Sequence, residues 1–164
     1  MMDDFIEAMG EIKYDSTEDT SMHIDTVRYN WAKFRNRMAL RIEKHDASKL
    51  EPPEKEDFDK YTPKLHTLTY GSPEYMKCVD ELKKGALAHH YEVNAHHPEH
   101  YPDGMNGFDL FDLIELWCDW CAAVKRHDDG DIMKSIEFNA KRFDMPPMLV
   151  NILKNTATRY KDEI

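Results

Sequence analysis

The sequence predicts an all-α fold, a bundle of roughly six or seven helices. Apolar residues recur at steps of three and four, which is typical of the buried face of a helix. No convincing run alternates apolar and polar residues, as a half-buried strand would. Good helix starts also recur, for example at Ser72-Pro73-Glu74, where an N-cap, a proline and an acid follow one another.

The composition suits one globular domain. Of the 164 residues, 41% are apolar and 33% charged, which excludes collagen, a low-complexity chain and a disulfide-stapled miniprotein. No apolar run approaches the roughly 20 residues that span a bilayer, so we expect no membrane contact. Three cysteines, an odd number, argue against an extracellular disulfide framework. We therefore expect a soluble, cytoplasmic protein.

The formal net charge of −10 is unevenly distributed. Residues 1–20 contribute −6, and we expect them to form an acidic, poorly ordered segment ahead of one domain over residues 21–164. Nucleic-acid binding is disfavoured, because neutralising phosphates requires a broad basic surface.

The first predicted helix begins near Thr20 and Ser21, either of which can cap it. Its apolar stripe consists of Ile24, Val27, Trp31, Phe34, Met38 and Ile42. Basic residues accompany this stripe: Arg28, Lys33, Arg35, Arg37, Arg41 and Lys44. They form either a solvated helix face or a rim that attracts phosphate.

Prolines and caps divide the rest of the chain. Pro52-Pro53 predicts a connection, and the helix that starts at Pro73 is expected to reach His96 or His97. Residues 98–104 form a loop. Further helices are predicted from Asp109 to His127, from Asp131, and after Asp144, where two prolines follow.

Histidines are concentrated in the middle of the chain. Five of the nine lie within twelve positions: His89, His90, His96, His97 and His100. On one helix His90, Asn94 and His97 would share a face, with His89 and His96 on the adjacent one. Neutral imidazole is the commonest metal ligand in proteins, so the cluster predicts a metal site. A string of surface histidines without function is the alternative.

Two other places carry the same chemistry. His45-Asp46 near a helix end can turn toward one cation, and Lys49 would follow one turn later. Asp112, Glu115 and Asp119 line up as an acidic stripe. Asp119 lies between two tryptophan–cysteine pairs, where a carboxylate is costly without a metal or hydrogen bonds. The alternative is an amphipathic helix that exposes this stripe to water.

The order of these residues resembles the HD-domain superfamily of metal-dependent phosphohydrolases, whose pattern is H…HD…D on a helical bundle. It is more closely similar to a small uncharacterised HD-like family of phages and bacteria. The matching motifs are His45-Asp46-Ala47-Ser48-Lys49, His89 through His100, and Glu115 through Trp120. The resemblance covers roughly residues 23–127 and implies an HD-like helical domain, located in the host cytoplasm if a phage encodes it.

The resemblance also implies the ligands of one or two divalent ions. These are His23, His45, Asp46 and Asp119, joined by His90, His96 and His97. Mixed imidazole and carboxylate donors suit Mn, Fe, Co, Ni or Zn. One straight helix would hold His23 about 33 Å from His45, so the chain must bend near residues 35–39 if His23 is a ligand.

The implied activity is hydrolysis of a phosphoester in a nucleotide or similar small phosphorylated metabolite. Lys49 is expected to hold a phosphate oxygen, and Glu115 to orient a ligand or move a proton. Arg28 and Arg35 are candidates for contacting a distal phosphate. The alternative is a non-catalytic accessory protein that binds a metal or nucleotide, such as a phage anti-defence binder. A purely helical interaction module would leave the histidines unexplained, and a homodimer is common among HD relatives.

Overall fold

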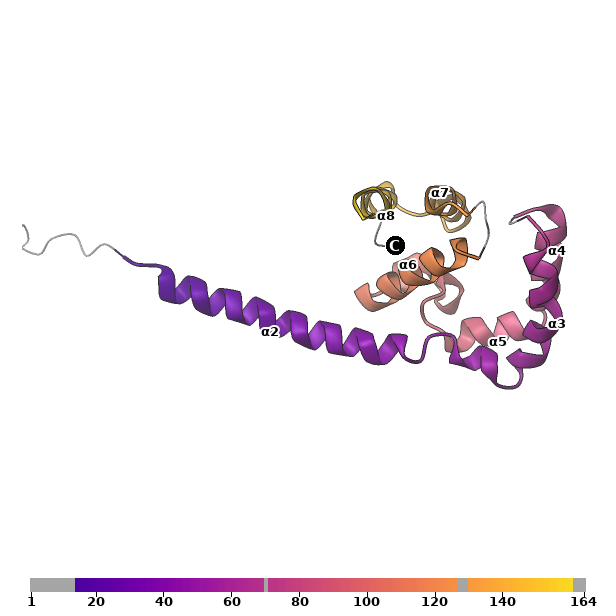
Figure 1. The fold of residues 1–164 in the computed structure, drawn as a ribbon, viewed down its shortest axis with the longest axis horizontal. Coiled ribbons are helices and arrows are strands. Elements are labelled where there is room, and N and C mark those ends of the chain that lie inside the picture. Colours follow the sequence, from indigo (N-terminus) through magenta and orange to yellow (C-terminus); the bar gives the residue numbers. More distant parts are fainter. Residues whose placement is uncertain (1–13, 70, 127–129, 161–164) are drawn as a thin grey trace, which may run out of the picture. The chain divides into compact units, whose positions relative to one another are not determined.

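The computed structural model describes residues 14–69, 71–126 and 130–160. This part of the chain contains seven α-helices, three short 3₁₀ helices and no strand, which confirms the all-α prediction (Figure 1). The α-helices are α2 (Thr17–Ile42), α3 (Glu54–His66), α4 (Pro73–Leu82), α5 (Ala86–Val93), α6 (Leu110–Val124), α7 (Ile132–Arg142) and α8 (Pro147–Arg159). The 3₁₀ helices are η1 (Ala47–Leu50), η2 (Pro98–His100) and η3 (Gly104–Gly107).

The chain divides into two compact units, Met1–Arg41 and Ile42–Ile164. Residues 1–13 of the predicted acidic segment lie outside the described residues, and α2 begins inside its last four positions. The predicted domain over residues 21–164 stays a prediction. None of the described helices is both long enough and apolar enough to cross a membrane.

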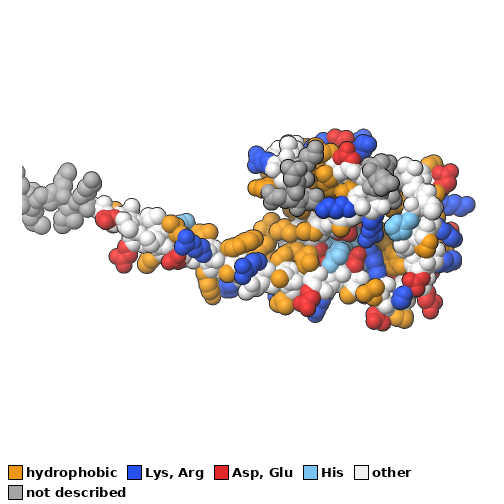
Figure 2. Space-filling view, in the orientation of Figure 1, with side chains coloured by type: hydrophobic (Ala, Val, Ile, Leu, Met, Phe, Trp, Pro, Cys, Tyr) orange, Lys and Arg blue, Asp and Glu red, His pale blue; other side chains and the backbone are white. Residues whose placement is uncertain are grey.

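The first unit consists, among its described residues, mainly of α2. The helix runs without a break to Ile42, including residues 35–39, where the sequence analysis required a bend only if His23 is a ligand. None of its residues is buried; Trp31, in the middle of the apolar stripe, is 60% exposed. Hydrophobic and basic side chains are visible along α2 in Figure 2. The predicted stripe exists, but α2 does not bury it.

In the second unit, α3 was not predicted. It follows Pro52-Pro53 directly, and Pro63 lies inside it. A proline in a sequence usually indicates the end of a helix, so Pro63 argued against a helix in this segment. Three acids in the first turn, where the positive end of the helix dipole favours them, support the start of α3.

The single helix expected from Pro73 to His96 or His97 is wrong, because α4 ends at Leu82 and α5 begins only at Ala86. Gly85, between them, approaches α3 closely: a Cβ there would meet the Asp57 Oδ2 at 2.7 Å. The same oxygen accepts the backbone N–H of Ala86 at 3.3 Å. The break therefore lets α5 start against α3, and these two helices pack together with α4.

The last three helices form the apolar core of the second unit. The predicted start of α6 is confirmed: Asp109 and Asp112 form a capping box. The predicted starts after Asp131 and Asp144 are confirmed by α7 and α8. The buried residues of this core are Leu116, Trp120, Ile136, Met145, Leu153 and Ala157. This core holds α6 rigidly, and α6 carries the acidic side of the site described next.

Candidate metal centre

His45 and Asp46 enter the site from the bend between Ile42 and η1. Asp46 has a left-handed backbone with φ of 55°, which aspartate tolerates better than most residues. This bend brings Asp46 Oδ2 to 3.5 Å from His45 Nε2, although neighbouring residues on a helix would point apart. Lys49 on η1 binds the same Asp46 oxygen at 2.5 Å. The three side chains thus face one region, as the sequence analysis expected.

The histidines come from the end of α5 and the turn after it. His90 is on the helix, and Asn94 then leaves the helical conformation. The Asn94 side-chain amide donates to the carbonyl of His90 at 2.9 Å, which ties the turn back to the helix. His96 and His97 lie in this turn, not on the helix as predicted. His90 and His96 are almost completely buried, at 0% and 1% exposure.

Two carboxylates reach the same region from α6, one turn apart. Glu115 is buried and Asp119 half-buried. Asp112, the third acid of the predicted stripe, has a different role: it accepts the backbone N–H of Asp109 at 2.9 Å and the hydroxyl of Tyr101 at 2.8 Å. The alternative of a stripe exposed to water is therefore not what the structure shows: the stripe is largely buried, and its last two members lie in the site.

These side chains form two sets of possible ligands that share Asp46. The inner group consists of Asp46, His90, His96 and His97. The outer group consists of His45, Asp46 and Asp119. Within each set the donor atoms lie within 4.8 Å of one another. Three imidazoles with one carboxylate, and one imidazole with two carboxylates, are donor sets that suit first-row transition metals.

The inner group converges closely. His90 Nε2 lies 2.9 Å from His97 Nε2 and 3.2 Å from Asp46 Oδ1. His96 Nε2 lies 3.5 Å from the same Asp46 oxygen. Both Asp46 Oδ1 and His96 Nε2 are buried without a hydrogen bond to any described residue. Because an unsatisfied buried polar atom is costly, these two atoms are the strongest observation in favour of a bound cation.

Glu115 contacts one histidine of each group, His45 of the outer group and His96 of the inner group. Its Oε1 lies 2.9 Å from His45 Nδ1 and 3.2 Å from His96 Nδ1. A carboxylate that accepts the Nδ1 proton of a histidine leaves the Nε2 lone pair available to a metal. His45, His96 and Glu115 could themselves surround an ion. The two Glu115 contacts described above are to the Nδ1 atoms of these histidines, a geometry that suits orienting their rings.

Two supporting residues were missed by the sequence analysis, Glu54 and Ser48. Glu54 has no exposed surface and contacts the Nδ1 atoms of His89 and His90. Ser48 Oγ accepts the side-chain amide of Asn94 at 2.9 Å. Nothing in the sequence indicates that an acid after two prolines is buried. Only the packing of α3 on α5 shows that Glu54 is buried against the histidines.

The charges of the site are strongly coupled. The carboxylate of Asp119, 3.7 Å from His45 Nε2, and that of Glu115, hydrogen-bonded to His45 Nδ1, raise the pKa of His45 to about 10. Burial lowers the pKa of His97 to about 2, and the neighbouring imidazoles of His96 and His90 act in the same direction. Burial acts to raise the pKa of Asp46, but His90 and Lys49 outweigh it, so the net pKa is well below normal. Burial also acts to raise the pKa of Asp119, but the interaction with His45 outweighs it, so this pKa is lowered as well.

His23 is the one predicted ligand outside these groups. It is exposed on α2, and this helix continues without a break from His23 to Ile42. Along a straight helix these two residues are about 28 Å apart. Its role as a ligand stays a prediction. Arg28, proposed to contact phosphate, pairs with Asp25 at 3.0 Å on the same helix.

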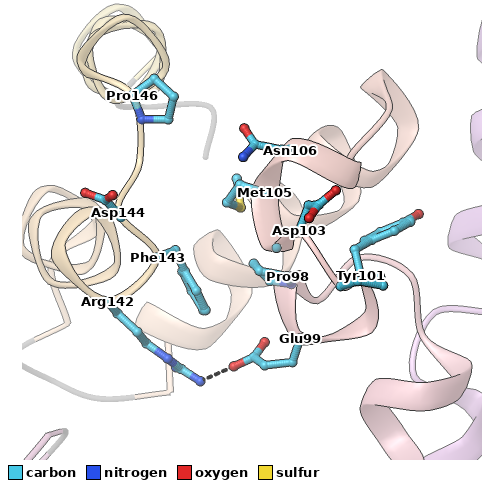
Figure 3. Close-up of a pocket in the computed structure, with 12 residues that line it drawn as sticks. Pro98, Glu99, Tyr101, Asp103, Met105, Asn106, Arg142, Phe143, Asp144 and Pro146 are labelled. Carbon is cyan, nitrogen blue, oxygen red and sulfur yellow. Dashed lines mark hydrogen bonds and ion pairs between the residues drawn. The ribbon is translucent and has the colours of Figure 1, made fainter.

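A pocket of about 500 Å³ adjoins the turn that follows His97 (Figure 3). Glu99 of η2 and Arg142 of α7 form a 2.5 Å ion pair beside it. The lining residues are Pro98, Glu99, Tyr101, Pro102, Asp103, Gly104, Met105, Asn106, Arg142, Phe143, Asp144 and Pro146. None of the predicted site residues lines this pocket, so the metal centre is a separate feature.

Comparison with known protein families matches residues 12–159 to DUF5662, a family of unknown function. The match includes every residue of the inner and outer groups. No curated protein and no solved structure matches the chain.

Proposed function

Since the chain belongs to the DUF5662 family, whose function is unknown, we propose from the site itself that it is a metal-dependent phosphohydrolase. Its substrate class is a nucleotide or a similar small phosphorylated metabolite. The observation that carries the proposal is the inner group, where Asp46 Oδ1 and His96 Nε2 are buried without a hydrogen bond among the described residues. The order of the ligands along the chain also supports the resemblance to HD phosphohydrolases.

The cofactor of the proposal is one or two ions of Mn, Fe, Co, Ni or Zn. His90, His96, His97 and Asp46 would hold one, and His45, Asp119 and the shared Asp46 a second. The chemistry that a bound divalent cation supplies is activation of water near neutral pH and polarisation of the phosphoryl oxygens.

The remaining residues act on the substrate or the ligands. The Lys49 ammonium beside Asp46 would bind a phosphate oxygen, and its 29% exposed side chain is accessible to substrate. Glu115 would keep the Nε2 atoms of His45 and His96 directed into the site. The side chain of Asp119 is 22% exposed, so the outer group is partly accessible to solvent. A cytoplasmic location and a homodimer stay predictions.

The test compares two aspartates that share a left-handed backbone, Asp46 and Asp144, with φ of 55° and 46°. Asp46→Asn keeps the residue shape and tolerates this backbone, but removes the charge common to both groups. Asp144→Asn, an exposed position outside both groups, is the matched control. Metal content and phosphate release from a nucleotide panel would be measured on the full-length chain with Mn, Co, Ni and Mg.

We expect bound metal and phosphate release in the wild type and in Asp144→Asn, and neither in Asp46→Asn. If the wild type binds metal but releases phosphate from none of the phosphorylated compounds, the phosphohydrolase proposal is overturned. The alternative, a non-catalytic accessory protein that binds a metal or nucleotide, would then be favoured. Wild-type metal content and turnover in Asp46→Asn would overturn the assignment of the site.

A further inference from the structure

Glu54 is a completely buried carboxylate in the first turn of α3, with 0% exposure. Its Oε1 lies 2.7 Å from the Nδ1 atom of His89, and its Oε2 lies 2.9 Å from the Nδ1 atom of His90. Burying a carboxylate is unfavourable unless it is paired and hydrogen-bonded. Both of these contacts are to imidazoles, so the burial of Glu54 is tied to the two histidines of α5.

The surroundings of His90 determine which of its ring nitrogens carries the proton. Two other polar atoms lie near His90 Nδ1, the side-chain nitrogen of Asn94 at 3.0 Å and Ser48 Oγ at 3.3 Å. The Ser48 hydroxyl can accept as well as donate a hydrogen bond, so it is compatible with a proton on Nδ1. The Asn94 amide has two protons, and Ser48 Oγ and the His90 carbonyl oxygen, both at 2.9 Å, accept them. The carboxylate of Glu54 is purely an acceptor and requires a proton on Nδ1. His90 therefore donates from Nδ1 to Glu54 and keeps a lone pair on Nε2.

The Nε2 atom of His90 points into the inner group, 3.2 Å from Asp46 Oδ1 and 2.9 Å from His97 Nε2. We infer that Glu54 is a positioning residue of the metal centre, which holds His90 in the tautomer and orientation that bind a transition-metal cation. The inference rests on the proposed metal centre, but not on the reaction. Glu54 serves His90 as Glu115 serves His45 and His96, so two buried carboxylates on different helices orient three of the histidines.

The experiment measures Co(II) binding and its visible absorption on the full-length chain, without any turnover. Glu54→Gln keeps the shape of the side chain but removes the charge that holds the Nδ1 proton. We expect its Co(II) affinity to fall about 10- to 100-fold, the usual cost of losing such a support, and its absorption bands to change. Asp112→Asn is the matched control, because Asp112 is equally buried, at 1% exposure, and supports the start of α6 instead. It should keep the wild-type affinity and spectrum.

Each result separates the two proposals. If the wild-type chain binds no Co(II), the metal centre itself is overturned. If it binds Co(II) and Glu54→Gln matches it in affinity and spectrum, only the role of Glu54 is overturned. An equal loss in Asp112→Asn also overturns it, because burial alone would then explain the effect.

A second measurement needs no variant and therefore does not depend on Glu54→Gln folding. In the wild-type chain loaded with Zn(II), nitrogen NMR should find the His90 proton on Nδ1. A proton on its Nε2 would overturn the inference.

Discussion

The inner and outer groups share Asp46 but differ in their donors and their exposure. The inner group has three imidazoles, and the side chains of His90 and His96 are each 1% exposed. The outer group has one imidazole and a second carboxylate, and the side chains of His45 and Asp119 are 26% and 22% exposed. The donors of the inner group are buried and mostly imidazoles, which suits a tightly held transition metal. The partly exposed donors of the outer group remain accessible to solvent and to other ligands. We therefore propose that the inner group retains the metal and that the outer group binds the substrate.

The largest expected effect is the loss of metal when one inner ligand is removed. His96→Gln should lower Co(II) affinity by more than the roughly 10- to 100-fold loss expected for a supporting residue, because it removes a donor atom. Asp119→Asn should retain the ion of the inner group and lose turnover. Equilibrium titration with Co(II), beside phosphate release, measures both. Equal metal loss in the two variants would abolish the distinction between the groups.

A smaller effect is expected for the cation at the edge of the outer group. Lys49→Met keeps most of the side-chain stem but removes the ammonium, so kcat/KM should fall about 100-fold with metal content unchanged. Lys55→Met is the control, since Lys55 pairs with Asp59 at 2.8 Å on the exposed side of α3. If Lys49→Met instead loses its metal, the lysine stabilises the ligands and does not act on substrate.

The smallest expected effect is the release of one proton. At pH 7.5 the metal-free chain holds His45 protonated, because its pKa is raised to about 10 by Asp119 and Glu115. Binding a metal through Nε2 must displace that proton, so affinity through the outer group should increase with pH up to about 10. The pKa of His97 is lowered to about 2, so this inner ligand is already neutral.

Calorimetric titration in buffers of different ionisation enthalpy counts these protons. His45→Gln should release about one proton fewer than the wild type, and His97→Gln should release the wild-type number. Identical counts for the wild type and His45→Gln would remove His45 from the ligands.

The protonated His45 also affects the stability of the metal-free chain. Its folded-state pKa lies above the ordinary value of 6.5, so its pairing stabilises the fold below about pH 6.5. That contribution is lost as the pH rises toward 10.

Two helices mark the limit of prediction from periodicity. The sequence predicted helices at both α2 and α6, and both are formed. In α6, Leu116 and Trp120 are buried, at 2% and 8% exposure, whereas Trp31 in the apolar stripe of α2 is 60% exposed. Periodicity records which residues share one face of a helix, which is a local property. Whether another element covers that face depends on residues distant in the sequence.

The sequence alone determined the helical class, the caps of the later helices and the ligand types, because caps, periodicity and side-chain chemistry are local. It also placed His45, Asp46, the histidines and Asp119 among the candidate ligands. Only the tertiary structure decided that His96 and His97 lie in a turn, that Glu115 faces Nδ1 atoms, and that Glu54 supports His90. Burial and the direction of a ring nitrogen arise where separate helices meet, so no local pattern of residues records them.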